Sequence, residues 1–160
     1  MTGFWKLSLL AATAVALTAC SPGSPPRDGT AVLGDDPRVI VHDFSFGQDM
    51  LLVLTLEYVP EHGCLLVHTN DAETGEPVEV LAPIWPSDVE PLHEDGRIGV
   101  TVPEVGALVD GDAFTSGGSH TDASDLNEVP DLPGECLPEG GFVTINQGSV
   151  ERGAPDPDLV

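Results

Sequence analysis

The feature that most constrains the fold is a series of short segments in which apolar residues recur with a period of two. The strongest, 50–59, places Leu52, Leu54 and Leu56 on one face of an extended strand, because successive side chains of a strand point to opposite sides. No window of the chain has the sustained 3.6-residue period of an amphipathic helix. Further segments of the strand type lie at 38–44, 63–69, 77–85, 97–102, 107–109, 113–116 and 141–146.

Turn-forming sequences such as Asp95-Gly96 and Asp110-Gly111-Asp112 separate these segments. Glycine and aspartate favour tight chain reversals, so the spacing predicts an all-β domain of about six or seven short strands, built as a small barrel or a sandwich. Segment 50–59 also carries Leu51, Val53 and Val59 on its second face. We therefore expect it to be a central strand that is covered on both sides.

The N-terminus combines a basic residue, a short apolar stretch and a cysteine. Lys6 is followed by eleven mainly apolar residues, 7–17, and then by the sequence Leu17-Thr18-Ala19-Cys20. This apolar stretch is too short for a transmembrane helix, which needs about 20 residues, and it suits a signal peptide. The whole pattern resembles the signal peptide of a bacterial lipoprotein, with Leu17-Thr18-Ala19-Cys20 as its lipobox. The resemblance implies that residues 1–19 are removed and that Cys20 carries the lipid. Two or more acyl chains, palmitate among them, would then hold the protein firmly at the extracytoplasmic face of the cell membrane.

The remaining chain is expected to form one domain between two unstructured segments. Residues 20–36 are rich in proline, glycine, serine and aspartate, which predicts a flexible tether. Residues 37–150 are expected to form the β domain, and 151–160 a disordered tail.

The charge of the chain excludes one class of partner. Twenty-seven aspartate and glutamate residues face five lysine and arginine residues, which gives a formal net charge of −22. Such a surface repels phosphate backbones and anionic headgroups. Nucleic acid is therefore not an expected partner, and contact with the membrane is expected through the N-terminal lipid alone.

Two cysteines remain once Cys20 is assigned to the lipid. In an exported chain, Cys64 and Cys136 most simply form one disulfide. The alternative is a copper or zinc site, because His62, Cys64 and His68 share one face of a strand and have suitable ligand atoms. The obvious partner of Cys64 favours the disulfide.

Several motifs resemble a small, uncharacterised extracytoplasmic domain that recurs in secreted proteins of high-GC Gram-positive bacteria. They are Gly63-Cys64-Leu65-Leu66-Val67, Pro83-Ile84-Trp85-Pro86, Asp95-Gly96, Val109-Asp110-Gly111-Asp112, Gly117-Gly118 and Cys136 with Phe142-Val143. The resemblance implies a disulfide-linked β domain, such as a partly open barrel of the OB (oligonucleotide/oligosaccharide-binding) type. It implies no catalytic residues.

Few residues indicate a reaction or a cofactor. The sequence lacks GxSxG and SxxK motifs, and no cofactor is expected. Asp110 and Asp112 are weak candidates for a calcium site, although the pair is more typical of a hairpin turn. Trp85 and Tyr58 are candidates for an aromatic surface that binds a glycan or peptide, although for Trp85 a place in the core, pinned by Pro83 and Pro86, is favoured.

These observations favour a lipid-anchored, non-catalytic binding or accessory module of the cell envelope. An envelope protein or a glycan is the expected partner. The alternatives are a calcium-binding lipoprotein and, less favoured, a small hydrolase.

Overall fold

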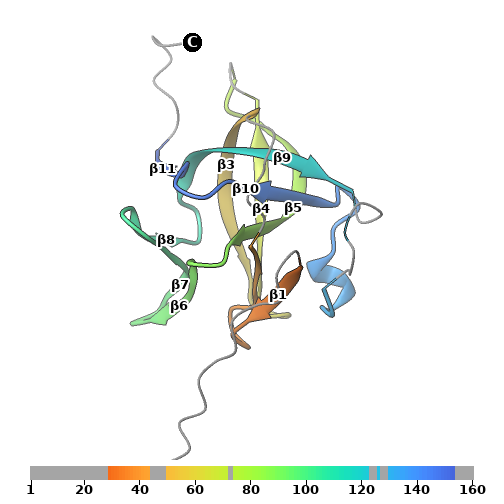
Figure 1. The fold of residues 1–160 in the computed structure, drawn as a ribbon, viewed down its shortest axis with the longest axis vertical. Coiled ribbons are helices and arrows are strands. Elements are labelled where there is room, and N and C mark those ends of the chain that lie inside the picture. The colour runs from red at the N-terminus through yellow and green to blue at the C-terminus, as the bar shows by residue number, and fades with distance from the viewer. Residues whose placement is uncertain (1–28, 44–49, 72–73, 123–125, 127–129, 154–160) are drawn as a thin grey trace, which may run out of the picture.

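A computed structural model describes residues 29–43, 50–71, 74–122, 126 and 130–153 of the chain. The described part is all-β, as predicted, with eleven strands and one short 3-10 helix, η2 (Figure 1). The strands are β1 (Thr30–Leu33), β2 (Val39–His42), β3 (Met50–Val59), β4 (Cys64–Asn70), β5 (Pro77–Pro86), β6 (Glu90–Glu94), β7 (Arg97–Val102), β8 (Gly106–Val109), β9 (Ala113–Thr121), β10 (Phe142–Ile145) and β11 (Glu151–Arg152). Helix η2 spans Gly134–Cys136.

Five of the strands close into a barrel. The hydrogen-bonded order is β4, β3, β9, β10 and β5, and β5 pairs with β4 to complete the ring. All neighbours are antiparallel except β5 and β10, which are parallel. Such a five-stranded Greek-key barrel is the OB-like architecture that the resemblance implied, and of the barrel and the sandwich predicted from the strand pattern it is the barrel that forms. The hairpin β1–β2 continues the sheet beside the second half of β5.

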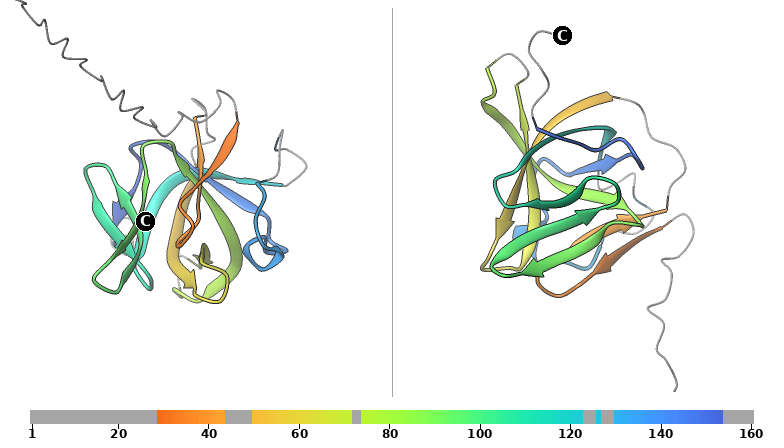
Figure 2. Two further views of the ribbon diagram at one scale, coloured as in Figure 1. Left: turned by 90° about the horizontal axis from the view of Figure 1, so that it is seen from below. Right: turned by 90° about the vertical axis from the view of Figure 1, so that its left-hand side faces the viewer.

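A separate three-stranded sheet, β6–β7–β8, lies beside the barrel (Figure 2). Its residues Val100, Val102 and Leu108 belong to the same hydrophobic core as Leu54 and Leu56 inside the barrel. The small sheet is inserted between β5 and β9 in the chain, and its strands β7 and β8 contact β3 of the barrel.

The barrel has a second core on its outer surface. Leu66, Ile84 and Phe142 point outward from β4, β5 and β10, and the partly buried Leu132 and Leu137 pack against them. We call residues 130–141 the strap, because this segment crosses the outside of the barrel. Residues 81–86 of β5 are all buried because the strand has the barrel core on one side and the strap on the other.

Three expectations about the strands and segments are wrong. Segment 50–59 is not covered on both faces along its length, because the outer core reaches the second face at Val59 and leaves Leu51 67% exposed at the other end of the strand. Residues 30–33 of the predicted tether form β1, which pairs with β2 along its whole length. Glu151 and Arg152 of the predicted tail form β11 on the edge of β9.

The remaining predicted segments fall elsewhere. Residues 1–19, Cys20, the tether up to residue 28 and the tail from residue 154 lie outside the described residues. In the described part of the chain, no helix has the length and apolarity needed to cross a bilayer.

Candidate functional site

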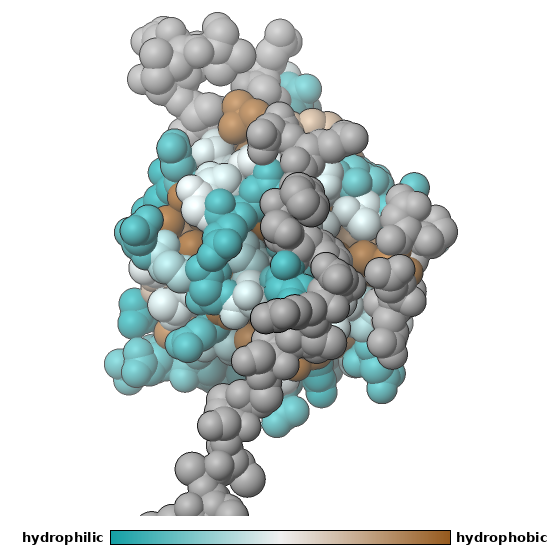
Figure 3. Space-filling view, viewed as in Figure 1, coloured by the Kyte–Doolittle hydropathy of each residue, from teal (hydrophilic) through white to brown (hydrophobic). Residues whose placement is uncertain are grey.

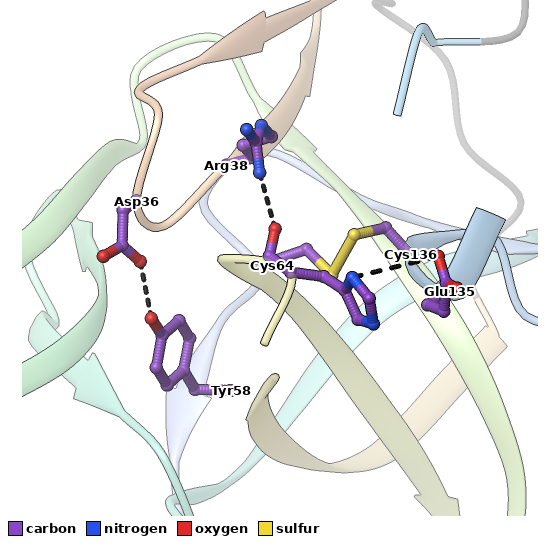
Figure 4. Close-up of a disulfide and its surroundings, with 7 residues drawn as sticks. Asp36, Arg38, Tyr58, Cys64, Glu135 and Cys136 are labelled. Atoms are coloured by element: carbon purple, nitrogen blue, oxygen red, sulfur yellow. Dashed lines mark hydrogen bonds and ion pairs between the residues drawn. A yellow bond between two sulfur atoms is a disulfide. The ribbon is translucent and has the colours of Figure 1, made fainter. Parts of the chain in front are cut away.

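The predicted disulfide is confirmed. Cys64 at the start of β4 and Cys136 at the end of η2 are bonded, with their Cα atoms 5.9 Å apart (Figure 4). The bond fixes the strap to the outside of the barrel, next to the turn at His62 and Gly63. This turn is held from the other side by Arg38, whose backbone N–H donates to the Gly63 carbonyl oxygen at 2.7 Å and whose Nη1 donates to the His62 carbonyl oxygen at 2.5 Å.

The residues of the alternative metal site do not come together as ligands. Cys64 has no thiolate to offer, because its sulfur is bonded to Cys136. His68 pairs with Glu57 at 2.6 Å, and His62 lies 3.8 Å from Glu135. Within the described ranges, no group of three or more histidine, cysteine, aspartate or glutamate residues could hold a metal ion.

Asp110 and Asp112 have structural hydrogen bonds in the turn before β9. Asp110 Oδ1 accepts the backbone N–H of Tyr58 at 2.8 Å. Asp112 Oδ2 accepts the backbone N–H of Val109 and Nη1 of Arg152, each at 3.0 Å. The two carboxylates thus tie the turn to β3 and β11, as expected for a hairpin turn.

The predicted aromatic surface is not formed by Trp85. This side chain is fully buried and stacks on Phe114 inside the barrel, with ring centroids 5.6 Å apart. The favoured expectation, a core position for Trp85, is confirmed, and the aromatic surface is wrong at this residue, because β5 directs Trp85 into the barrel core.

Tyr58 lies at the barrel surface, where its hydroxyl donates to Asp36 Oδ1 at 2.5 Å (Figure 4). This hydrogen bond raises the pKa of the phenol, because the proton is shared with a carboxylate, and burial and the charges of Asp36 and Glu61 act in the same direction. The Tyr58 side chain therefore binds Asp36, which lies in the turn before β2, and connects this turn to the barrel.

A pocket of about 480 Å³ lies where the barrel meets the small sheet. Three chain reversals form its walls: the β5–β6 turn with Asp88, the β7–β8 turn with Glu104, and the β10–β11 loop with Gln147. Each reversal is closed by a backbone hydrogen bond between residues three apart, from 89 to 86, from 105 to 102 and from 149 to 146.

The floor of the pocket is apolar and its rim is acidic. Val89, Val102 and Val150 line it and are at most 7% exposed. Asp88, Glu104 and Gln147 are exposed at its edge. No lysine, arginine or histidine is among its described lining residues. The pocket can therefore bind an apolar group and place a cationic or hydrogen-bond-donating group at the rim.

The two rim carboxylates differ in their contacts. Gln147 Nε2 donates to Asp88 Oδ2 at 3.0 Å, which links two of the three walls. Among the described residues, the Glu104 carboxylate has no hydrogen-bond or ion-pair partner. Its backbone has a φ of 65° at the third position of the turn Val102–Val105, where a type II turn favours glycine.

A buried histidine lies close to this pocket. His42, opposite Pro86 in the β2–β5 pairing, donates from Nε2 to the carbonyl oxygen of Ile145 at 2.9 Å. Burial lowers its pKa, although the Ile145 carbonyl and the charges of Asp43 and Asp88 oppose this shift. His42 is therefore neutral at pH 7 and supplies no positive charge to offset the acidic rim.

Sequence reasoning missed the pocket. Its walls come from residues 86–89, 102–105 and 147–150, which are far apart in the chain. The one local signal of this site in the sequence is Pro103-Glu104. Proline is typical of the second position of a turn, whereas glutamate is poorly suited to the third position. No family model, curated protein or solved structure matches this chain.

Proposed function

We propose that this chain is a lipid-anchored, non-catalytic binding module of the cell envelope. The observation that carries the binding role is the pocket at the junction of the barrel and the small sheet, with its valine floor and its acidic rim. A concave apolar surface with a few convergent polar groups is the usual form of a ligand site.

A second observation concerns the face that OB barrels often use. Oligonucleotides and oligosaccharides bind such barrels on the outer face of the second and third strands and on the adjoining loops. Here these strands are β4 and β5, and the strap covers their outer side with Leu132 and Leu137. The covered face, together with the net charge of −22, supports a partner other than nucleic acid and a site elsewhere on the domain.

The visible surface supports a role in solution above the membrane. In Figure 3, hydrophobic residues on this face form small separate patches among hydrophilic ones. An acidic domain of this kind is repelled by anionic lipid, so attachment falls to Cys20 and its acyl chains. Labelling of growing cells with an alkyne-tagged fatty acid tests this part: the wild-type chain should be labelled and found with membranes. Labelling of a Cys20→Ser variant to the same extent would contradict it.

The binding role is tested with the full lipidated chain in nanodiscs. Hydrogen exchange at residues 86–89, 102–105 and 147–150 is measured with a panel of probes. The panel contains capped pentapeptides with a central lysine, arginine, norleucine or glutamate, and an N-acetylglucosamine trisaccharide. Slower exchange in these three segments with at least one probe is expected. Unchanged exchange with every probe would contradict the binding role.

A further inference from the structure

The polarity of the pocket changes in one direction, from floor to rim. Val89, Val102 and Val150 form the apolar floor, and the carboxylates of Asp88 and Glu104 stand at the edge. A basic side chain has the matching order, because lysine and arginine join an aliphatic stem to a cationic end. Such side chains lay the stem along apolar surface while the charged end stays among polar groups.

Both rim carboxylates can accept further hydrogen bonds. Asp88 receives one from Gln147 at 3.0 Å, and an ionised carboxylate has about four acceptor positions. Glu104 has no partner among the described residues. No described lining residue supplies a positive charge. A cationic group of a ligand would therefore meet no competing cation from the described lining at the carboxylates of Asp88 and Glu104.

The charge of the whole chain points to the same kind of ligand. The net charge of −22 attracts basic partners and speeds their encounter with the domain, and a concave site of one sign concentrates that field. An acidic or phosphorylated ligand would be repelled at the rim. A neutral glycan could donate hydroxyl groups to the two carboxylates, but it brings no positive charge to match them.

We propose that the pocket binds a lysine or arginine side chain of a partner polypeptide. This inference rests on the binding role proposed above and names the chemistry of the ligand. The aliphatic stem lies against the valine floor, and the cationic end is hydrogen-bonded by Asp88 and Glu104.

The backbone at Glu104 offers a way to separate binding from folding. Its φ of 65° is unfavourable for any residue with a Cβ and suits glycine. Glu104→Gly should therefore raise the melting temperature while it weakens binding. Glu104→Gln removes the charge and keeps the backbone, so it should weaken binding with little change in melting temperature.

The experiment measures dissociation constants of the capped pentapeptides for the full lipidated chain in nanodiscs, from the concentration dependence of hydrogen exchange at residues 102–105. A hydrogen-bonded charge pair changes an affinity by about tenfold or more. We expect this loss for the lysine or arginine peptide with Glu104→Gln. Glu139→Gln is the matched control, because it removes one charge from the exposed strap and should change affinity by less than about twofold.

Other outcomes would overturn the proposal in distinct ways. Equal weakening by Glu104→Gln and Glu139→Gln would mean non-specific attraction to an acidic surface. Norleucine and lysine peptides of equal affinity would mean a purely apolar pocket. Protection by the trisaccharide, with none by the basic peptides, would overturn the ligand class and leave the binding role standing, whereas no protection by any probe would overturn both. A lower melting temperature for Glu104→Gly and Glu104→Gln would make Glu104 a structural residue.

Discussion

The disulfide between the strap and the barrel allows a quantitative prediction. Replacing Cys64 and Cys136 together by alanine removes a cross-link between residues 72 apart in the sequence. In the chain-entropy model, a loop of this length contributes about 4 kcal/mol at 25 °C, because the cross-link restricts the unfolded chain. Domains of this size have unfolding free energies of about 5–15 kcal/mol, so the variant should lose a large part of its stability.

The measurement is urea-induced unfolding of the wild-type chain and the double variant. We expect the midpoint to fall and the slope to rise slightly, because the unlinked unfolded chain exposes more surface. Leu137→Ala is the comparison, because it keeps the disulfide and removes a partly buried contact with the outer core. Leu137→Ala should lower the unfolding free energy by less than the double variant does, namely by about 1–2 kcal/mol. A difference below about 1 kcal/mol between the wild-type chain and the double variant would refute the chain-entropy reasoning.

Further measurements test the cores. Gly118→Ala should lower the unfolding free energy by about 1–3 kcal/mol, because the added Cβ would lie 2.2 Å from a backbone carbonyl oxygen of β10. Gly134→Ala is the control, because its Cβ meets open space, and it should leave the unfolding free energy unchanged in the same urea assay. Because burial lowers the pKa of His42, the unfolded chain binds the extra proton as the pH falls below about 6.5, and stability falls with it. His42→Gln should lose less stability than the wild-type chain between about pH 7.5 and pH 5; equal losses would contradict the buried neutral state. Residues 20–160 contain one tryptophan, Trp85, and acrylamide should quench its fluorescence only after unfolding; quenching in the native state would contradict its place in the core.

The strand pattern was the most informative part of the sequence. The alternation at Leu52, Leu54 and Leu56 predicted a strand at this place, and all three side chains are buried. The pairing of Cys64 with Cys136 was also predictable, because the predicted assignment of Cys20 to a lipid leaves two cysteines and one possible disulfide.

Other features depend on tertiary contacts that no local pattern contains. Leu51 and Leu54 are the same type of residue in one strand, yet Leu51 is exposed and Leu54 is buried. The closure of the barrel decides which face of β3 is inside. Strands β1 and β11 are short, and each forms by pairing with a strand that is already part of the sheet.

The candidate site was the least predictable part. Asp88, Glu104 and Gln147 lie on three separate turns, and acidic residues are so common in this chain that none stands out by composition. The three residues come together at one pocket only when the small sheet packs against the barrel. Glu104 alone has a local signature, namely a side chain at a turn position that favours glycine.

The central claim is that Glu104 in the pocket contacts the cationic end of a basic side chain. A double-mutant cycle tests it most directly, with the full chain as wild type or Glu104→Gln, and with the pentapeptide that carries lysine or norleucine. The four dissociation constants give the coupling between the carboxylate and the ammonium group. We predict a favourable coupling of about 1–2 kcal/mol. A coupling of zero would contradict the claim.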